Sequence, residues 1–162
     1  MSKVKGDGIY DFVEDGERVL YSSSLREVMN SVKNGEDLVS FEKPGPKELI
    51  YFEPAKTKVA IVTCGGLCPG LNNVIRGLVT HLYNRYGVTN IVGVQYGYAG
   101  LNPDLQIPFI DLNPDLVDDI HKDGGSMLAS SRGQQPYEII VDTLERNNIN
   151  ILFCVGGDGT LK

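Results

Sequence analysis

From residue 58 onward, the sequence alternates between short, nearly continuous apolar runs and longer segments whose apolar positions recur with helical periodicity. The apolar runs are residues 59–63, 91–94 and 151–155, and each contains β-branched side chains. Runs of this length and composition are typical of strands that are covered on both faces, as in parallel sheets. Residues 71–83 and 136–146 instead place apolar side chains three and four positions apart, which predicts amphipathic helices.

A further helix is predicted between the second and third strands. Asn113 is a suitable N-cap, and Pro114 suits the first helical position. We expect the inner face of this helix to extend to Ile120, and Gly124 to end it. Strands that alternate with helices predict an α/β fold with a doubly wound parallel sheet, in which ligands bind at the carboxyl ends of the strands.

Residues 1–55 lack this alternation, and we expect them to form an N-terminal extension to a main domain of residues 56–162. Ser24 and Glu27 have the spacing of a capping box, and Gly35 is placed to end the short helix that follows. Short β-type runs flank this helix at residues 19–21, 39–41 and 49–52. The extension is interpreted as an arm that packs on the main domain or on another subunit.

Two glycine-rich turns follow the first and third predicted strands, at residues 65–72 and 156–160. In the first turn, Gly65 and Gly66 precede a helix start, so bare backbone N–H groups and the positive end of the helix dipole favour a phosphate. A tight strand-to-helix connection without a ligand would have the same pattern. The turn matches neither the Walker sequence nor Gly-x-Gly-x-x-Gly, and no acidic residue ends the second strand, so an NAD-dependent oxidoreductase is disfavoured.

The second turn places Asp158 among three glycines at the end of a predicted strand. A carboxylate beside amides that hold phosphate is the arrangement that places Mg²⁺ on a nucleotide. The alternative is a turn aspartate that bonds to its own backbone.

A third segment, residues 124–133, begins with two glycines and contains three serines and Arg132 between the two turns. We expect it to reach the same edge of the sheet, where Arg132 would offer a permanently charged, forked donor to a transferring phosphoryl group. A solvated loop arginine is the alternative. The two histidines, His81 and His121, lie on polar helix faces and receive no role.

Composition narrows the class of protein. The 162 residues suffice for one domain with a core, and the formal net charge of −6 disfavours nonspecific binding to nucleic acid or to a membrane surface. Neither a membrane-spanning run nor a signal peptide is recognisable, so we expect a cytoplasmic protein. Three cysteines beside strand ends do not suggest disulfides, and without other nearby ligands they do not suggest zinc.

With these residues identified, the sequence resembles the phosphofructokinases. Four blocks match in order, namely residues 65–77, 96–101, 124–132 and 156–160. The extension is similar to that of the plant, trypanosomatid and spirochaete branch. NAD kinases and lipid kinases share the Gly-Gly-Asp-Gly-Thr turn but lack the Pro-Gly-Leu-Asn block before it.

This resemblance implies transfer of a phosphoryl group from ATP to the 1-hydroxyl of fructose 6-phosphate, as in glycolysis. It implies that Gly66 contacts the donor phosphates through its amide, that Asp158 holds Mg²⁺, and that Tyr98 lies at the edge of the donor site. By the same resemblance, the ATP-binding residues are Gly66, Arg132, Gly133, Gly157, Asp158, Gly159 and Thr160.

Gly159 bears on the choice of phosphoryl donor. Pyrophosphate-using members of the family typically have aspartate at this position, where its bulk and charge crowd the α-phosphate of ATP. Glycine leaves room, so the resemblance favours ATP, with a pyrophosphate-dependent enzyme or a noncatalytic nucleotide-binding module as alternatives.

The family's catalytic stretch, Thr-Ile-Asp-Asn-Asp, does not occur in these residues, so we assign them no general base. The resemblance implies that the base and most of the sugar site lie beyond Lys162. The chain is therefore expected to be an inactive N-terminal fragment, the donor-binding part of a kinase that forms a homo-oligomer at full length.

Overall fold

The computed structural model describes residues 4–5 and 12–161, and the chain divides into two compact units, Met1–Tyr51 and Phe52–Lys162. Each unit is described by itself. The assignment of residues 1–55 and 56–162 as separate domains stays a prediction.

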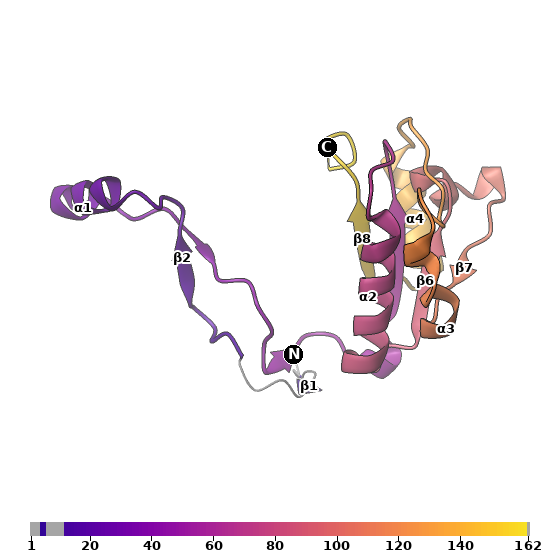
Figure 1. The fold of residues 1–162 in the computed structure, drawn as a ribbon, viewed down its shortest axis with the longest axis horizontal. Helices are drawn as coiled ribbons and strands as arrows, with labels where there is room; N and C mark the ends of the chain where they lie inside the picture. The colour runs from indigo at the N-terminus through magenta and orange to yellow at the C-terminus, as the bar shows by residue number, and fades with distance from the viewer. Residues whose placement is uncertain (1–3, 6–11, 162) are drawn as a thin grey trace. The chain divides into compact units, whose positions relative to one another are not determined.

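The described residues of the first unit form two short antiparallel strand pairs and one helix (Figure 1). Strands β1 (Val4–Lys5) and β4 (Leu49–Ile50) form one pair, β2 (Arg18–Leu20) and β3 (Ser40–Glu42) form the other, and α1 spans Leu25–Asn34. Only half of the predicted capping box forms. The Ser24 hydroxyl accepts the Glu27 N–H at 3.5 Å, but the Glu27 carboxylate accepts from the Ser22 hydroxyl instead of from the Ser24 amide.

The second unit contains a four-stranded sheet in the order β7-β6-β5-β8. Its strands are β5 (Lys58–Thr63), β6 (Asn90–Val94), β7 (Ile110–Asp111) and β8 (Ile151–Val155). The predicted α/β sheet is confirmed, because β5 runs parallel to both β6 and β8. The sheet is not wholly parallel, however, since the two-residue strand β7 pairs antiparallel with β6 at one edge.

Helical segments cover both faces of this sheet, as Figure 1 shows. The α-helices are α2 (Leu71–Tyr86), α3 (Pro114–Val117) and α4 (Tyr137–Arg146). The short 3₁₀ segments are η1 (Pro54–Lys56), η2 (Gly97–Leu101), η3 (Pro103–Leu105) and η4 (Ile120–Lys122). Apolar residues of α2 and α3 share one core with β5, and those of α4 and η2 share the other, which is the doubly wound arrangement.

The sequence-based prediction overestimated the burial of β8. Residues 59–63 of β5 are buried, as predicted, but every residue of β8 is only partly buried. The reason is topological, because β5 is flanked by two strands and β8 ends the strand order.

The helix predicted from Asn113 to Gly124 is also shorter than expected. Asn113 caps it as predicted, accepting the Leu116 N–H at 2.9 Å, but the α-helix ends at Val117. The Asp118 carbonyl accepts from the Arg76 guanidinium at 2.9 Å, and the Lys122 N–H bonds to the Asp119 carbonyl in 3₁₀ fashion. In a continued α-helix the Asp118 carbonyl would accept the Lys122 N–H, and here the Arg76 guanidinium bonds to that carbonyl instead.

The packing of η2 against the residues that follow β6 can be tested at Gly100. A side chain there would overlap the carbonyl oxygen of Gln95, so we expect Gly100→Ala to lower the free energy of unfolding by about 1–3 kcal/mol. Gly77→Ala is the matched control, because Gly77 has open space in the middle of α2 and alanine should stabilise by up to about 1 kcal/mol. Denaturant unfolding of the full-length protein measures both, and equal effects would contradict the packing argument.

Candidate functional site

Three segments meet at the carboxyl ends of β5, β6 and β8, toward the top of Figure 1: the first glycine turn, residues 124–133, and the turn of residues 156–160. Two hydrogen bonds join the first glycine turn to residues 124–133. The Gly65 N–H donates to the Ser131 carbonyl at 3.2 Å, and the Ser130 hydroxyl donates to the Gly65 carbonyl at 2.6 Å. The predicted convergence of these segments at one edge of the sheet is therefore observed.

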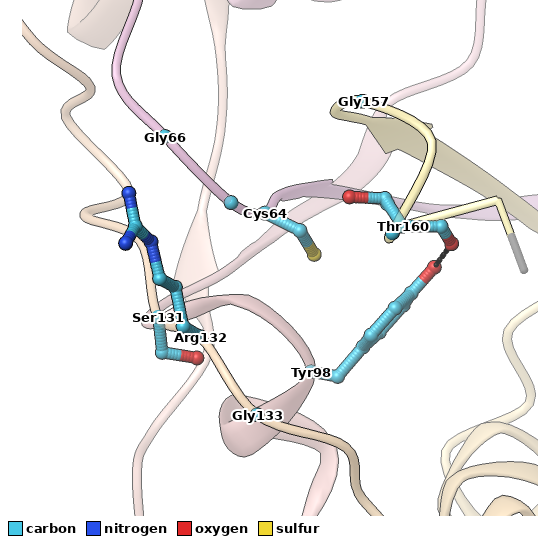
Figure 2. Close-up of a pocket in the computed structure, with 10 residues that line it drawn as sticks. Cys64, Gly66, Tyr98, Ser131, Arg132, Gly133, Gly157 and Thr160 are labelled. Atoms are coloured by element: carbon cyan, nitrogen blue, oxygen red, sulfur yellow. Dashed lines mark hydrogen bonds between the residues drawn. The ribbon is translucent and has the colours of Figure 1, made fainter.

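The segments line a cavity of about 330 Å³, which we call the first cavity (Figure 2). Its lining residues are Cys64, Gly65, Gly66, Tyr98, Ser131, Arg132, Gly133, Gly157, Gly159 and Thr160. Six of the seven ATP-binding residues implied by the resemblance are in this set. The seventh, Asp158, is exposed in the same turn but does not line the cavity, and its role as a metal ligand stays a prediction.

Arg132 is the cation among the residues that line the first cavity. Figure 2 shows its guanidinium directed toward Gly66, and a β-carbon built on Gly66 would lie 3.9 Å from the Arg132 Nη2 atom. Within the described part of the chain, the guanidinium forms no ion pair or hydrogen bond. Its donors are thus available to an anion that reaches the amide of Gly66.

Arg132 also lines a second cavity of about 500 Å³. This cavity shares Gly65, Gly66 and Ser131 with the first cavity and extends to Gly124 and Ser126. Its wall consists mainly of glycines and serines, so it offers backbone amides and hydroxyls to a polar ligand.

Tyr98 and Thr160 hold the second glycine turn in place. The Tyr98 hydroxyl donates to the Thr160 carbonyl at 2.9 Å, the interaction drawn as a dashed line in Figure 2. Burial raises the pKa of Tyr98, so the phenol stays protonated and remains a donor at neutral pH. The turn also requires Gly156, because a β-carbon there would overlap the side chain of Thr160.

Cys64 is a cavity residue to which the sequence analysis assigned no role. Its side chain is buried, and Figure 2 shows its sulfur pointing into the cavity. Burial raises the pKa of the Cys64 thiol, so it is uncharged at neutral pH. The sequence signal that could have identified Cys64 as a site residue is its position. It directly follows β5, at the carboxyl end of a parallel strand.

The described residues of the site do not form a complete metal-binding site by themselves. Among the residues that the structure describes, no three His, Cys, Asp or Glu side chains are grouped closely enough to hold a metal ion. Asp158 nevertheless presents an exposed carboxylate, which is the ligand type that Mg²⁺ prefers, and Mg²⁺ commonly completes its shell with phosphate oxygens and water.

No helix within the described ranges combines the length and apolar character that crossing a membrane requires.

Comparison of the sequence with known proteins finds a family that it matches. The family model described as "Phosphofructokinase" matches residues 58–162. The chain is 53% identical over 157 residues to the ATP-dependent 6-phosphofructokinase of Borreliella burgdorferi, covering 96% of this chain and 34% of that protein. It is 56% identical over 137 residues to the enzyme of the same name from Entamoeba histolytica, covering 83% and 31%. The chain thus spans about a third of the length of these relatives.

A solved structure agrees at the level of the fold. The pyrophosphate-dependent phosphofructokinase of Marinobacter aquaeolei superimposes with a TM-score of 0.55 and 17% sequence identity, over 64% of this chain and 27% of that one. At this identity the likeness concerns the fold alone, and the fold does not distinguish one phosphoryl donor from another.

Proposed function

Because the chain belongs to the phosphofructokinase family, we propose that it supplies the ATP- and magnesium-binding part of an enzyme that phosphorylates fructose 6-phosphate. The observation that carries this proposal is that Arg132 faces Gly66 in a cavity lined by both glycine turns, while its guanidinium has no partner among the described residues. Two relatives named as ATP-dependent enzymes, each more than half identical to this chain where aligned, support ATP as the donor.

We assign the following roles within this proposal. The amides of the two glycine turns hold the phosphates of the donor, and Arg132 stabilises the charge on the transferring phosphoryl group. Asp158 supplies a carboxylate oxygen to Mg²⁺, and the ion neutralises phosphate charge when it is bound. Tyr98 holds the second turn through the Thr160 carbonyl.

The rest of the reaction requires groups that we do not assign to the described residues. A general base must activate the 1-hydroxyl of fructose 6-phosphate. We propose that the base and the sugar site correspond to regions of the relatives' sequences with which this chain does not align. Homo-oligomerisation and a cytoplasmic location also stay predictions.

A coupled assay for fructose 1,6-bisphosphate tests the proposed function in the full-length protein. With Mg²⁺ and fructose 6-phosphate present, we expect ATP to support product formation and pyrophosphate to support little. A preference for pyrophosphate would replace the proposal with the pyrophosphate-dependent alternative. If calorimetry detected Mg-ATP binding but no product formed with either donor, a noncatalytic nucleotide-binding module would be the correct reading.

A further inference from the structure

The side chain of Asn72 is buried near the start of α2, with only 3% of its surface exposed, and its amide bonds to a segment more than 50 residues away in sequence. The Nδ2 group donates to the Asp123 carbonyl at 3.2 Å. The Oδ1 atom accepts from the Met127 N–H at 2.8 Å. The Asn72 side-chain amide therefore bonds to both ends of residues 123–127, as a donor at Asp123 and as an acceptor at Met127.

The segment held in this way leads directly to Arg132. The Thr63 hydroxyl donates to the Ala129 carbonyl at 2.7 Å, and Leu128 is fully buried. The Ser131 carbonyl accepts the Gly65 N–H at 3.2 Å. Hydrogen bonds to the backbone thus continue to Ser131, the residue before Arg132, and the Arg132 guanidinium itself has no partner among the residues that the structure describes.

Asn72 does not act as a cap for its own helix. The N-cap of α2 is Gly70, and no side chain caps this helix. The polar atoms of Asn72 are directed instead to the backbone of the Arg132 segment, where an apolar side chain would leave the Met127 amide and Asp123 carbonyl without these partners.

We propose that Asn72 is a positioning residue, which holds residues 123–131 so that Arg132 meets the transferring phosphoryl group. This inference rests on the proposed function. It assigns Asn72, the last residue of the first glycine turn, a role that involves no contact with the ligand. A displacement of about 1 Å at a group that contacts the reacting atoms can cost on the order of a hundredfold in rate. The two hydrogen bonds of Asn72 are therefore expected to matter for turnover as well as for stability.

Asn72→Asp in the full-length protein is the principal test. The introduced carboxylate keeps an acceptor for Met127 but turns an oxygen toward the Asp123 carbonyl, so the segment should shift. We expect kcat and kcat/KM for ATP to fall together by about tenfold or more, with little change in KM. Asn73→Asp is the matched control for charge, because Asn73 is exposed and the substitution adds the same charge one residue further along α2. It should lower kcat much less than Asn72→Asp does.

Two additional variants separate positioning from simple destabilisation. Asn72→Ser removes both hydrogen bonds without adding a charge, and it serves if the aspartate variant does not fold by circular dichroism. In an Arg132→Ala background, Asn72→Asp should lower kcat by less than about twofold further, because its effect would act through Arg132.

Independent, multiplicative effects of the two substitutions would overturn the inference, as would equal kinetics for Asn72→Asp and Asn73→Asp. An inactive parent protein would instead overturn the proposed function, and the inference with it.

Discussion

Gly159→Asp in the full-length protein is expected to lower kcat/KM for ATP by at least about a hundredfold, with a much smaller effect on the use of pyrophosphate. A carboxylate at this position would face phosphate charge, and a like-charge contact that excludes water costs several kcal/mol. The backbone tolerates the change, because Gly159 has open space where a β-carbon would stand and does not require a positive φ. Steady-state kinetics with each donor measure the effect.

Gly159→Asn separates bulk from charge, since asparagine has nearly the same shape as aspartate. If repulsion dominates, the asparagine variant should retain much more ATP-dependent activity than the aspartate variant. An equal loss of ATP-dependent and pyrophosphate-dependent activity in Gly159→Asp would contradict the role of this residue in the choice of donor.

Arg132→Ala is expected to lower kcat by about a hundredfold to a thousandfold, the range observed when a donor that stabilises transition-state charge is removed. The guanidinium lines both cavities and has no protein partner within the described chain, so its loss should not break an internal ion pair. Arg132→Lys should recover little activity, because an ammonium lacks the forked geometry of the guanidinium.

Arg146→Ala is the matched control for this prediction. Arg146 is an exposed arginine on α4 that lies 3.8 Å from Asp142 and lines neither cavity, so its removal should leave kcat nearly unchanged. A normal kcat for Arg132→Ala would exclude Arg132 from the chemical step.

The hydrophobic pattern predicted most of the second unit. The periodic positions of α2 and α4 identified these helices, because their apolar stripes are long enough to distinguish helix from strand. The pattern could not identify β7, which has only two residues, nor the edge position of β8, because an apolar run does not specify its neighbours in the sheet. The contact of Arg76 with the Asp118 carbonyl, just beyond the end of α3, joins residues more than 40 positions apart and therefore has no local signal.

The candidate site was predicted in a similar way. The two glycine turns indicated where backbone amides would gather, since each turn directly follows a parallel strand. Arg132 was recognised as a candidate cation because it lies in a glycine- and serine-rich segment between these turns. The roles of Tyr98 and Asn72 in holding these segments could not be derived from composition or spacing. Both depend on hydrogen bonds between segments more than 50 residues apart.

The position of β8 has a practical consequence for work with this chain. Within the described residues, β8 pairs with β5 on one side only, and its apolar side chains are half-buried. An open strand edge of this kind recruits strands from other molecules, so solubility at high concentration depends on what covers it. Because the turn of residues 156–160 directly follows β8, a foreign strand bound there would end beside the first cavity and could mask it in binding measurements.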